Sequence, residues 1–297
     1  MMDAERYDLI EDNEYGFFRL DPIPSDETLS EFYQSEYPEL LENGELAADV
    51  SRLLRDDDEA KRERIWRRST WYADHMDIIE REFPNCHRIL DVGCGTGEFI
   101  SFVMDQGYDA VGIEPSGRIG DTAREKGFDV HETTVEKYAE SQNTNFDLIT
   151  MFNVLEHVPN PIEVLEACRE LLIDDGMLIV KVPNEFNPFQ MAARAALNLG
   201  TWWVDPPTHI FYFNFDSLAK LLSDLGFEVQ ARFADFPMSQ FLLMGHNYVE
   251  NDEMGRDCHD QRVRFELAID DDHRRMFYSS LASVGLGRNC TLFATAE

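Results

Sequence analysis

Residues 89–99, with the sequence ILDVGCGTGEF, constrain the fold of this chain more than any other segment. An apolar strand ends at Asp91 and leads into a turn that holds Gly93, Gly95 and Gly97. Glycine tolerates turn conformations that a Cβ forbids, and it lets the backbone come close to a ligand. A dinucleotide-binding loop has the different spacing G-x-G-x-x-G and holds a pyrophosphate at a helix N-terminus. Because the carboxylate at the mouth of this loop repels phosphate, the segment favours a ligand that carries a cationic amine.

The rest of the chain alternates between strand and helix patterns. Such alternation predicts a parallel sheet covered by helices on both faces, with ligands beyond the carboxyl ends of the strands. The last two strands flank a long insertion at 236–289 and are expected to pair antiparallel. The expected strands are 88–92, 109–114, 128–131, 146–152, 176–182, 227–235 and 290–296, and the expected helices are 97–106, 116–126, 134–140, 161–172 and 215–225.

The charge balance excludes some classes of partner. The chain has 58 acidic residues against 26 basic ones, and its net charge is −32. Such a charge disfavours binding to nucleic acid or anionic membranes through bulk electrostatics. The 43% hydrophobic content is too high for an acidic disordered chain. Because acidic residues are spread over the whole length, we expect a salt-adapted protein whose charges are strongly screened.

Cysteine usage and hydropathy indicate a reducing compartment. The five cysteines form no C-x-x-C pair, so neither a zinc ribbon nor a disulfide framework is expected. The first residues are polar and acidic, unlike a signal peptide. No apolar run reaches the roughly 20 residues that span a bilayer. We therefore expect a cytoplasmic protein without stable membrane insertion.

The first 60 residues differ from the remainder. Residues 15–33 contain two prolines, and Ser25 is the expected N-cap of a short helix. The run Asp56, Asp57 and Asp58 is interpreted as a solvated face or a linker. A longer helix is expected over 61–83, with an apolar stripe made of Ile65, Trp66, Tyr72, Met76 and Ile79. The sequence thus predicts an appendage or cap at 1–60 and a main domain at 61–297.

Further motifs follow the glycine loop in a fixed order. The strand at 109–114 ends at Glu114, whose carboxylate can accept hydrogen bonds from both hydroxyls of a ribose. The segments FDLITMFNVLEHVPNP (146–161), LLIDDGMLIVKVPN (171–184), NFDSLAKLLSDLGFEV (214–229) and LGRNCTLFATAE (286–297) come next. From about residue 60 to its end, the chain resembles the class I S-adenosylmethionine-dependent methyltransferases. The Leu-Glu-His-Val segment is typical of the ubiquinone-type O-methyltransferases and of many sugar and glycan methyltransferases.

The resemblance implies an α/β fold with a doubly wound, seven-stranded, mostly parallel sheet in the order 3-2-1-4-5-7-6, the last strand being antiparallel. It implies S-adenosyl-L-methionine as the cofactor. Adenine contacts are implied for Thr134 and Val135, mainly through the backbone. The complete set of implied cofactor-binding residues is Asp91, Gly93, Cys94, Gly95, Gly97, Glu114, Pro115, Thr134, Val135, Phe152 and Asn153.

Two histidines compete for the role of general base. His157 follows the strand that floors the site, and a neutral imidazole is a suitable base near pH 7. His209 lies in VDPPTHIFYFN (204–214), which resembles a loop over the substrate site of relatives. A third possibility is that neither histidine acts as a base, because positioning of the reacting groups alone can promote methyl transfer. Glu156 and His157 could hold a divalent metal, but two adjacent residues make a poor site, and no metal is expected.

The acceptor is expected to bind among aromatic later loops. The segments 183–213 and 236–289 are the expected substrate-side loops, and 191–204 is long enough to form a lid helix. Core packing also accounts for most of these aromatic residues. The residues proposed to contact substrate are Asn184, Trp202, His209 and Tyr212. An arginine of KRERIWRR (61–68) could reach the cofactor carboxylate or a substrate phosphate.

The expected activity is O-methylation of a small molecule, a sugar or a glycan or lipid-linked precursor. An N- or carboxyl-methyltransferase is the first alternative. The rival classes are an NAD-dependent oxidoreductase, whose loop spacing is missing here, and a cofactor-binding module that does not catalyse. Some similar enzymes carry a cysteine-rich metal ribbon before a segment like residues 15–25, which this chain lacks. Residues 1–60 are thus expected to cap the pocket or to form a homodimer contact.

Overall fold

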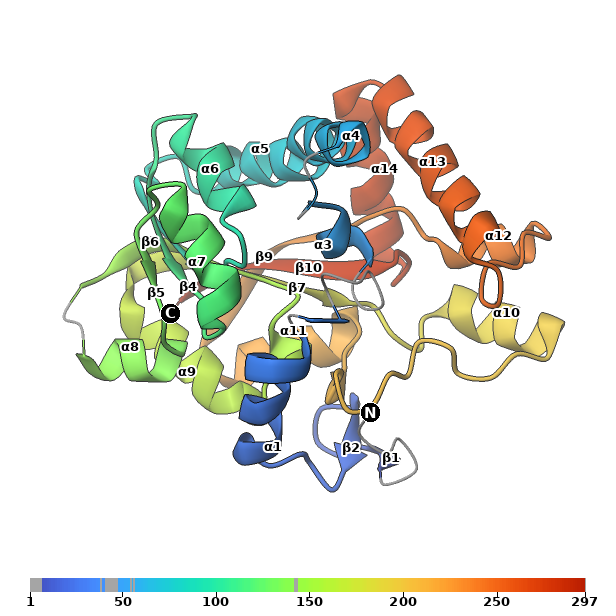
Figure 1. The fold of residues 1–297 in the computed structure, drawn as a ribbon, viewed down its shortest axis with the longest axis horizontal. Coiled ribbons are helices and arrows are strands. Elements are labelled where there is room, and N and C mark those ends of the chain that lie inside the picture. Colours follow the sequence, from blue (N-terminus) through green and yellow to red (C-terminus); the bar gives the residue numbers. More distant parts are fainter. Residues whose placement is uncertain are drawn as a thin grey trace.

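A computed structural model describes residues 7–37, 39–40, 48–53, 55, 57–141 and 144–296 (Figure 1). Seven strands form the main sheet in the order β5-β4-β3-β6-β7-β10-β9. β10 pairs antiparallel with both neighbours, whereas the pairs β3–β4, β3–β6, β4–β5 and β6–β7 are parallel. This is the predicted order 3-2-1-4-5-7-6, which is confirmed. The strands are β3 (Arg88–Val92), β4 (Asp109–Ile113), β5 (Val130–His131), β6 (Phe146–Phe152), β7 (Leu172–Pro183), β9 (Phe227–Ala234) and β10 (Asn289–Ala296).

Helices cover both faces of this sheet, as Figure 1 shows. One face packs against α8, α9 and α11, which supply Tyr138, Val164 and Leu218 to one hydrophobic core. The other face packs against α5, α6 and α14, which supply Met76, Phe99 and other apolar side chains to a second core. The bounds are α6 (Glu98–Met104), α7 (Gly117–Glu125), α8 (Val135–Ser141), α9 (Pro161–Leu171), α10 (Pro188–Leu197), α11 (Phe215–Asp224), α12 (Ser239–Leu243), α13 (Asp252–Ala268) and α14 (Asp271–Ser283).

The helix expected over 61–83 contains a change of winding that moves its buried face. α4 (Asp58–Arg67) continues through the π-helical turn η3 (Arg68–Tyr72) into α5 (Ala73–Glu82). A π turn holds more residues than an α turn, so it shifts the register of the helix face. Trp66 and Tyr72 are therefore buried, whereas Ile65 is 61% exposed. The expectation that Ile65 belongs to the apolar stripe is wrong for this reason.

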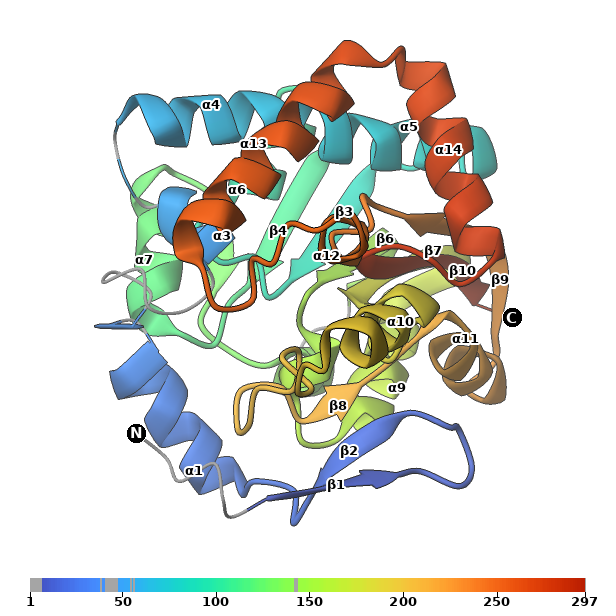
Figure 2. The same cartoon turned by 90° about the vertical axis from the view of Figure 1, so that its right-hand side faces the viewer.

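The N-terminal segment begins with a second, small sheet. Its three strands, β1 (Asp8–Glu11), β2 (Phe18–Asp21) and β8 (Phe211–Tyr212), pair antiparallel in the order β1-β2-β8. Figure 2 shows the β1–β2 hairpin beside β8, at the far side of α9 and α10 from the main sheet. α1 (Asp26–Glu31) follows, and Ser25 caps it by accepting from the amide of Thr28, as predicted. The turn η2 (Phe32–Glu36) and the helix α3 (Ala48–Leu53) come next.

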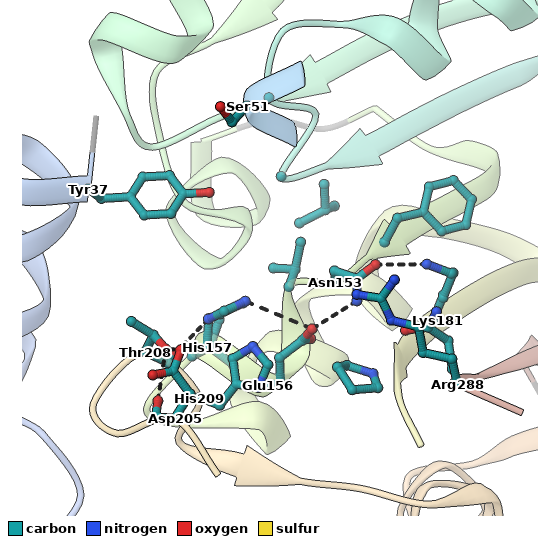
Figure 3. A pocket seen from close by; sticks show the side chains of 18 of the residues that line it. Tyr37, Ser51, Asn153, Glu156, His157, Lys181, Asp205, Thr208, His209 and Arg288 are labelled. Carbon is teal, nitrogen blue, oxygen red and sulfur yellow. Dashed lines mark hydrogen bonds and ion pairs between the residues drawn. The ribbon is translucent and has the colours of Figure 1, made fainter. Parts of the chain in front are cut away.

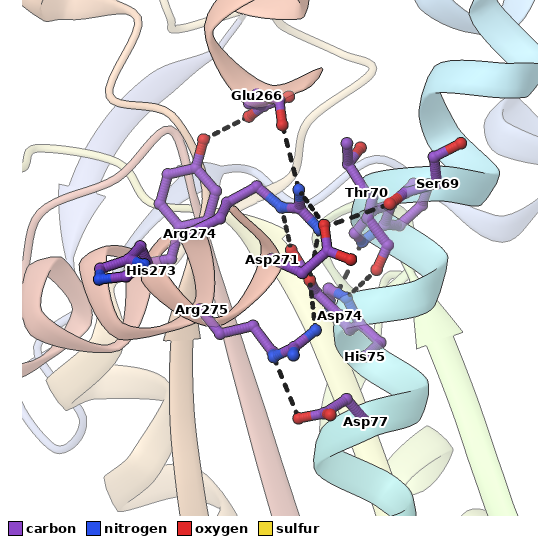
Figure 4. A network of polar contacts seen from close by, with 12 residues as sticks. Ser69, Thr70, Asp74, His75, Asp77, Glu266, Asp271, His273, Arg274 and Arg275 are labelled. Carbon is purple, nitrogen blue, oxygen red and sulfur yellow. Dashed lines mark hydrogen bonds and ion pairs between the residues drawn. The ribbon is translucent and has the colours of Figure 1, made fainter. Parts of the chain in front are cut away.

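A buried ion pair connects the insertion α12–α14 to α5 (Figure 4). Arg274 donates to both carboxylate oxygens of Asp74, at 2.7 and 2.8 Å, and each side chain is 2% exposed. The carboxylate of Glu266 accepts hydrogen bonds from Tyr278, from Trp66 Nε1 and from Arg262 Nε. Arg274 and Asp74 are 200 positions apart in the sequence. Charged hydrogen bonds between them fix the orientation of α14 relative to α5. Among the described residues, no helix is both long and apolar enough to cross a bilayer.

Candidate functional site

A deep cleft opens where the parallel strands β3, β4, β6 and β7 end. Its volume is about 1910 Å³. Val92, Ile113, Phe152 and Pro183 stand at the carboxyl ends of these four strands and all line it. Parallel α/β sheets bind ligands at this edge. The cleft is therefore where the sequence predicts the cofactor.

The N-terminal segment and the insertion supply the remaining walls of the cleft. Leu29 and Tyr33 line it from α1 and η2, and Arg52 lines it from α3. Arg256 and His259 line it from α13. Figure 3 shows Tyr37 and Ser51 of the N-terminal segment across the cleft from Glu156 and His157. Parts of both 1–60 and 236–289 thus face this cleft.

The glycine loop connects β3 to α6 and can approach a ligand closely. Gly93 has a φ of 71°, and a Cβ added there would collide with Cγ2 of Val154. Gly95 has a φ of 54°, and a Cβ added to it would meet no atom within 4 Å, because the residue borders open cleft. The backbone is thus exposed to a ligand at Gly95 and closely packed at Gly93. A side chain at Gly95 would fill the space that a ligand can use.

The carboxylate of Glu114, just after β4, is fixed by this loop. It accepts hydrogen bonds from the amide of Gly95 at 3.1 Å and from the amide of Ser116 at 2.8 Å. Burial raises the pKa of Glu114, whereas these two amide hydrogen bonds oppose that rise. The carboxylate lines the cleft next to Pro115. It can therefore accept hydrogen bonds from ligand hydroxyls without rearrangement of the loop.

The predicted cofactor residues fall into two groups. Gly93, Gly95, Glu114, Pro115, Thr134, Val135, Phe152 and Asn153 all line the cleft. Asp91, Cys94 and Gly97 do not line it. Asp91 is 4% exposed and accepts a hydrogen bond of 2.8 Å from Oγ1 of Thr150, and burial raises its pKa to about 7. Cys94 packs into the core beside Gly112. Asp91, Cys94 and Gly97 thus belong to the strand and the loop but do not form the cleft wall.

Asn153 and Lys181 organise the floor of the cleft. Lys181 donates to Oδ1 of Asn153 at 2.8 Å, which leaves the amide nitrogen of Asn153 to donate to Oε1 of Glu156 at 3.1 Å. The Lys181 ammonium also lies 4.3 Å from the ring centroid of Trp71. Glu156 is 1% exposed, and its Oε2 atom has no hydrogen-bond partner within the described parts of the chain. Burial raises the pKa of Glu156, and the neighbouring His157 opposes that rise.

His157 and His209 lie side by side although they are far apart in the sequence. His157 contacts Thr208, the residue before His209, which is 51 positions away. His157 stands in the short 3-10 helix η4 (Leu155–His157), and its Nδ1 contacts the carbonyl oxygen of Thr208 at 2.6 Å. A carbonyl only accepts, so Nδ1 must carry the proton and Nε2 is the basic atom. The rings of His157 and His209 are 4.8 Å apart between centroids. Nε2 of His157 lies 3.8 Å from Oε1 of Glu156.

His209 is in a different electrostatic environment. Burial, followed by the charges of His157 and Arg288, lowers the pKa of His209 to about 3. Its Nδ1 atom is buried with no hydrogen-bond partner within the part of the chain that the structure describes. His209 therefore stays neutral near pH 7 and is a weak base. Of the two predicted bases, His157 has the better-defined acceptor atom for a proton.

Ligand atoms of Glu156, His157 and His209 all lie within 4.8 Å of one another, which is a spacing that a metal centre requires. The sequence paired Glu156 with His157 but missed the third member. Only the fold brings His209 to them, through the backbone hydrogen bond from Ile210 to the carbonyl of Glu156. No local sequence signal indicates that contact. The same three groups can equally act as a base and its supports.

The predicted substrate residues also separate into two groups. Trp202 and His209 line the cleft. Asn184 and Tyr212 do not line it, because their polar groups bond inside the protein. Asn184 donates to the carbonyls of Gly285 and Gly287, and the Tyr212 hydroxyl donates to the carbonyl of His209 at 2.9 Å. These two residues hold the loops of the acceptor side. Within 191–204, a helix is present to residue 197, but only Trp202 and Trp203 reach the cleft.

The sequence did not single out several ionisable residues that line the cleft, among them Arg288 and Glu185. Arg288 lines the cleft from the loop before β10, and Glu185 lines it from the loop after β7. Glu185 directly follows the quoted segment 171–184 and Arg288 lies within the quoted segment 286–297, but the patterns of these segments predict strands and do not single out either side chain. Arg67 of the arginine-rich 61–68 segment also lines the cleft, but it donates to Glu63 at 3.1 Å.

Comparisons with known proteins agree with this geometry. The chain is 35% identical over 107 residues to a ubiquinone biosynthesis O-methyltransferase of Actinobacillus pleuropneumoniae serotype 7, a match that covers 33% of this chain and 46% of the relative. It is 38% identical over 103 residues to the Hahella chejuensis protein of the same name, covering 32% and 43%. The chain thus spans less than half the length of these curated relatives.

A solved structure shows the same fold over more of the chain. The plantazolicin methyltransferase BamL, whose structure contains a triazolic desmethylPZN analog and S-adenosylhomocysteine, covers 92% of this chain and 99% of its own length. Its TM-score is 0.52 at 14% identity. A family model described as a methyltransferase domain matches residues 33–232. This chain therefore belongs to the methyltransferase-domain family, and its resemblance to the class I S-adenosylmethionine-dependent methyltransferases is confirmed.

Proposed function

We propose that this protein transfers a methyl group from S-adenosylmethionine to a hydroxyl group of a small-molecule, sugar or glycan-precursor acceptor. The observation that carries the proposal is the group formed by Glu156, His157 and His209, which shares one cleft with the glycine loop and Glu114. A hydroxyl has a high pKa, so it gains more from a positioned base than an amine or a carboxylate does. The O-methyltransferase names of the two relatives support the same acceptor atom.

The residues that surround the cofactor end of the cleft suit this ligand. A Cβ at Gly95 would occupy the space beside the loop, so the backbone is open to a bulky ligand there. Glu114 offers a fixed carboxylate for two ribose hydroxyls. When bound, S-adenosylmethionine supplies an electrophilic methyl group and leaves as S-adenosylhomocysteine. The apolar Val135, Ile119 and Val92 line the same region and can contact a flat base.

His157 is the proposed general base. Its Nδ1 proton is held by the carbonyl of Thr208, so its Nε2 atom can take the proton of the acceptor hydroxyl. The deprotonated oxygen would then be the nucleophile for the methyl group that S-adenosylmethionine would supply. The carboxylate of Glu156 lies 3.8 Å from Nε2 and stabilises the imidazolium that forms. His209 stays neutral and packs beside the His157 ring.

Titration calorimetry tests the proposal against its two rivals. We expect S-adenosylhomocysteine to bind and NAD to give no heat. Binding of NAD without S-adenosylhomocysteine would indicate an oxidoreductase. A panel of phenols, sugars and amines is then incubated with S-adenosylmethionine, and S-adenosylhomocysteine release is measured. Release with hydroxyl acceptors supports the proposal, whereas release with amines alone favours N-methylation. If the protein binds the cofactor but releases no S-adenosylhomocysteine with any acceptor, it is a cofactor-binding module that does not catalyse.

A further inference from the structure

Arg288 presents a positive charge inside the cleft. It lies in the loop between α14 and β10 and lines the cleft, and Figure 3 shows it on the same side as Lys181 and Asn153. Its side chain is exposed, and within the described residues its guanidinium makes neither a hydrogen bond nor an ion pair. An arginine that offers five donors to no protein acceptor is available to a ligand.

Most of the other arginines that line the cleft are paired with carboxylates. Arg262 contacts Asp235 and Glu266 at 3.3 and 3.2 Å. Arg67 contacts Glu63 at 3.1 Å. Carboxylates outnumber cations by more than two to one in this chain, with 58 acidic residues to 26 basic ones. Within the described residues, Arg256 of α13 is the other cleft arginine without an ion pair, so Arg288 is one of two guanidinium groups there that a ligand can reach.

Two carboxyl groups that line the cleft with Arg288 do not cancel its charge. Glu185 is 6% exposed and accepts a hydrogen bond of 2.7 Å from Gln190. Burial raises the pKa of Glu185 to about 8, although Arg288 opposes that rise, so this carboxyl is mostly neutral near pH 7. Asp235 is already occupied, because it accepts from Arg262 and from the amide of Asn289.

Arg288 and the proposed catalytic group line the same cleft. The charge of Arg288 helps to lower the pKa of His209, which lies beside the His157 ring. Trp202 and Trp203 line the same cleft. A ligand that reaches His157 with a hydroxyl group can therefore place an acidic group near Arg288 and an aromatic or sugar ring between them.

We propose that Arg288 binds an anionic group of the methyl acceptor, so the acceptor is a hydroxyl compound that also carries a carboxylate or a phosphate. Arginine forms two parallel hydrogen bonds with either group, and this geometry gives both affinity and orientation. The inference rests on the proposed methyltransferase function and names the substrate class within it. The charge of Arg288 selects the acceptor, and His157 acts on its hydroxyl.

The test uses the full chain saturated with S-adenosylhomocysteine and three probes. These are 4-hydroxyphenylacetate, 4-hydroxyphenyl phosphate and the neutral methyl 4-hydroxyphenylacetate. Calorimetry should show at least one anionic probe binding about tenfold more tightly than the neutral ester, or about 1.4 kcal/mol. The better anion identifies the carboxylate or the phosphate as the preferred group. Equal affinity for all three probes, or no binding of either anion, would overturn the inference.

Three variants connect this preference to one side chain. Arg288→Met should bind the anionic and neutral probes alike, and Arg288→Lys should keep part of the preference because it keeps the charge. Arg264→Met is the matched control, because Arg264 is exposed on α13 and does not line the cleft. A preference that persists in Arg288→Met would reject the role of Arg288. If S-adenosylhomocysteine itself does not bind, the proposed function fails instead, so the two failures are distinguishable.

Discussion

The Nδ1 atom of His157 donates a hydrogen bond to the carbonyl oxygen of Thr208 at 2.6 Å. This contact fixes both the tautomer and the orientation of the imidazole. It also connects η4 to the loop that carries His209, so these two parts of the cleft wall depend on each other. A base whose tautomer is fixed needs no reorientation when it takes a proton.

Replacing His157 with Ala should lower kcat by roughly 10²- to 10⁴-fold, the usual contribution of a positioned general base. His209→Ala is the comparison, and its effect should be smaller because the pKa of His209 is lowered to about 3 by burial. Both variants are compared by S-adenosylhomocysteine release at saturating cofactor and acceptor. An equal or larger loss in His209→Ala would reject His157 as the base.

The cofactor site gives a second prediction. Glu114→Ala should weaken S-adenosylhomocysteine binding by more than about tenfold, because a charge-assisted acceptor for two hydroxyls is removed. Calorimetry measures the change. Glu125→Ala is the control, since Glu125 is exposed at the end of α7 and does not line the cleft. Unchanged affinity in Glu114→Ala would mean that this carboxylate does not contact the ligand.

The parts of the fold that the sequence predicted well have strong local patterns. β3 and β6 are apolar runs, and their observed bounds match the expected 88–92 and 146–152. Strands buried on both faces read as continuous hydrophobic runs, so their limits are visible in the sequence. β1 and β2 were missed, because the four-residue strands DLIE and FRLD show no clear period. The pairing of β2 with β8, about 190 positions away, has no local signal.

The site was predicted less completely, because motifs identify backbone positions and not side-chain directions. Asn184 and Tyr212 stand in the expected loops, yet their polar groups bond to the carbonyls of other loop residues. Cys94 belongs to the glycine loop, yet its sulfur faces the core. Arg288 lies in the segment 286–297, whose pattern predicts a strand and not a charged group in the cleft. Each outcome depends on tertiary packing that periodicity does not encode.

The ion pair of Asp74 and Arg274 should contribute strongly to stability. Asp74→Asn removes the buried charge partner of Arg274 and leaves it, among the described residues, only the largely exposed Asp271 at 2.8 Å, which should cost roughly 3–5 kcal/mol in the free energy of unfolding. Asp77→Asn in the same helix removes a partly exposed contact to Arg275 at 3.2 Å and should cost about 0–1 kcal/mol. Urea denaturation of both variants measures the difference. A similar loss of unfolding free energy in the two variants would show that burial does not strengthen the ion pair of Asp74 and Arg274.

The carboxyl of Glu185 should make stability depend on pH. Burial raises its pKa from 4.5 to about 8 in the folded protein. The folded state therefore binds the proton more tightly than the unfolded state, and this contribution to stability is lost as pH rises from about 4.5 to 8. Glu185→Gln should flatten this part of the profile of unfolding free energy against pH. Identical slopes for the wild type and the variant would contradict the assignment.

Salt should stabilise the protein. A net charge of −32 produces self-repulsion in the compact state. Raising potassium chloride from about 0.1 to 1 M shortens the Debye length from about 10 to 3 Å and weakens that repulsion. The melting temperature should rise across this range and rise less with an equal concentration of sucrose. A melting temperature that does not change with salt would argue against salt adaptation.

The position of β10 sets a limit on how this chain can be divided. The family match ends at residue 232, but β10 (289–296) lies between β7 and β9 in the main sheet. A fragment cut at the limits of the match would leave β9 with no neighbouring strand and would open the edge of β7 to other chains. The fragment would cover the residues that this chain shares with its family, but we expect that it would not fold by itself because its sheet would be incomplete.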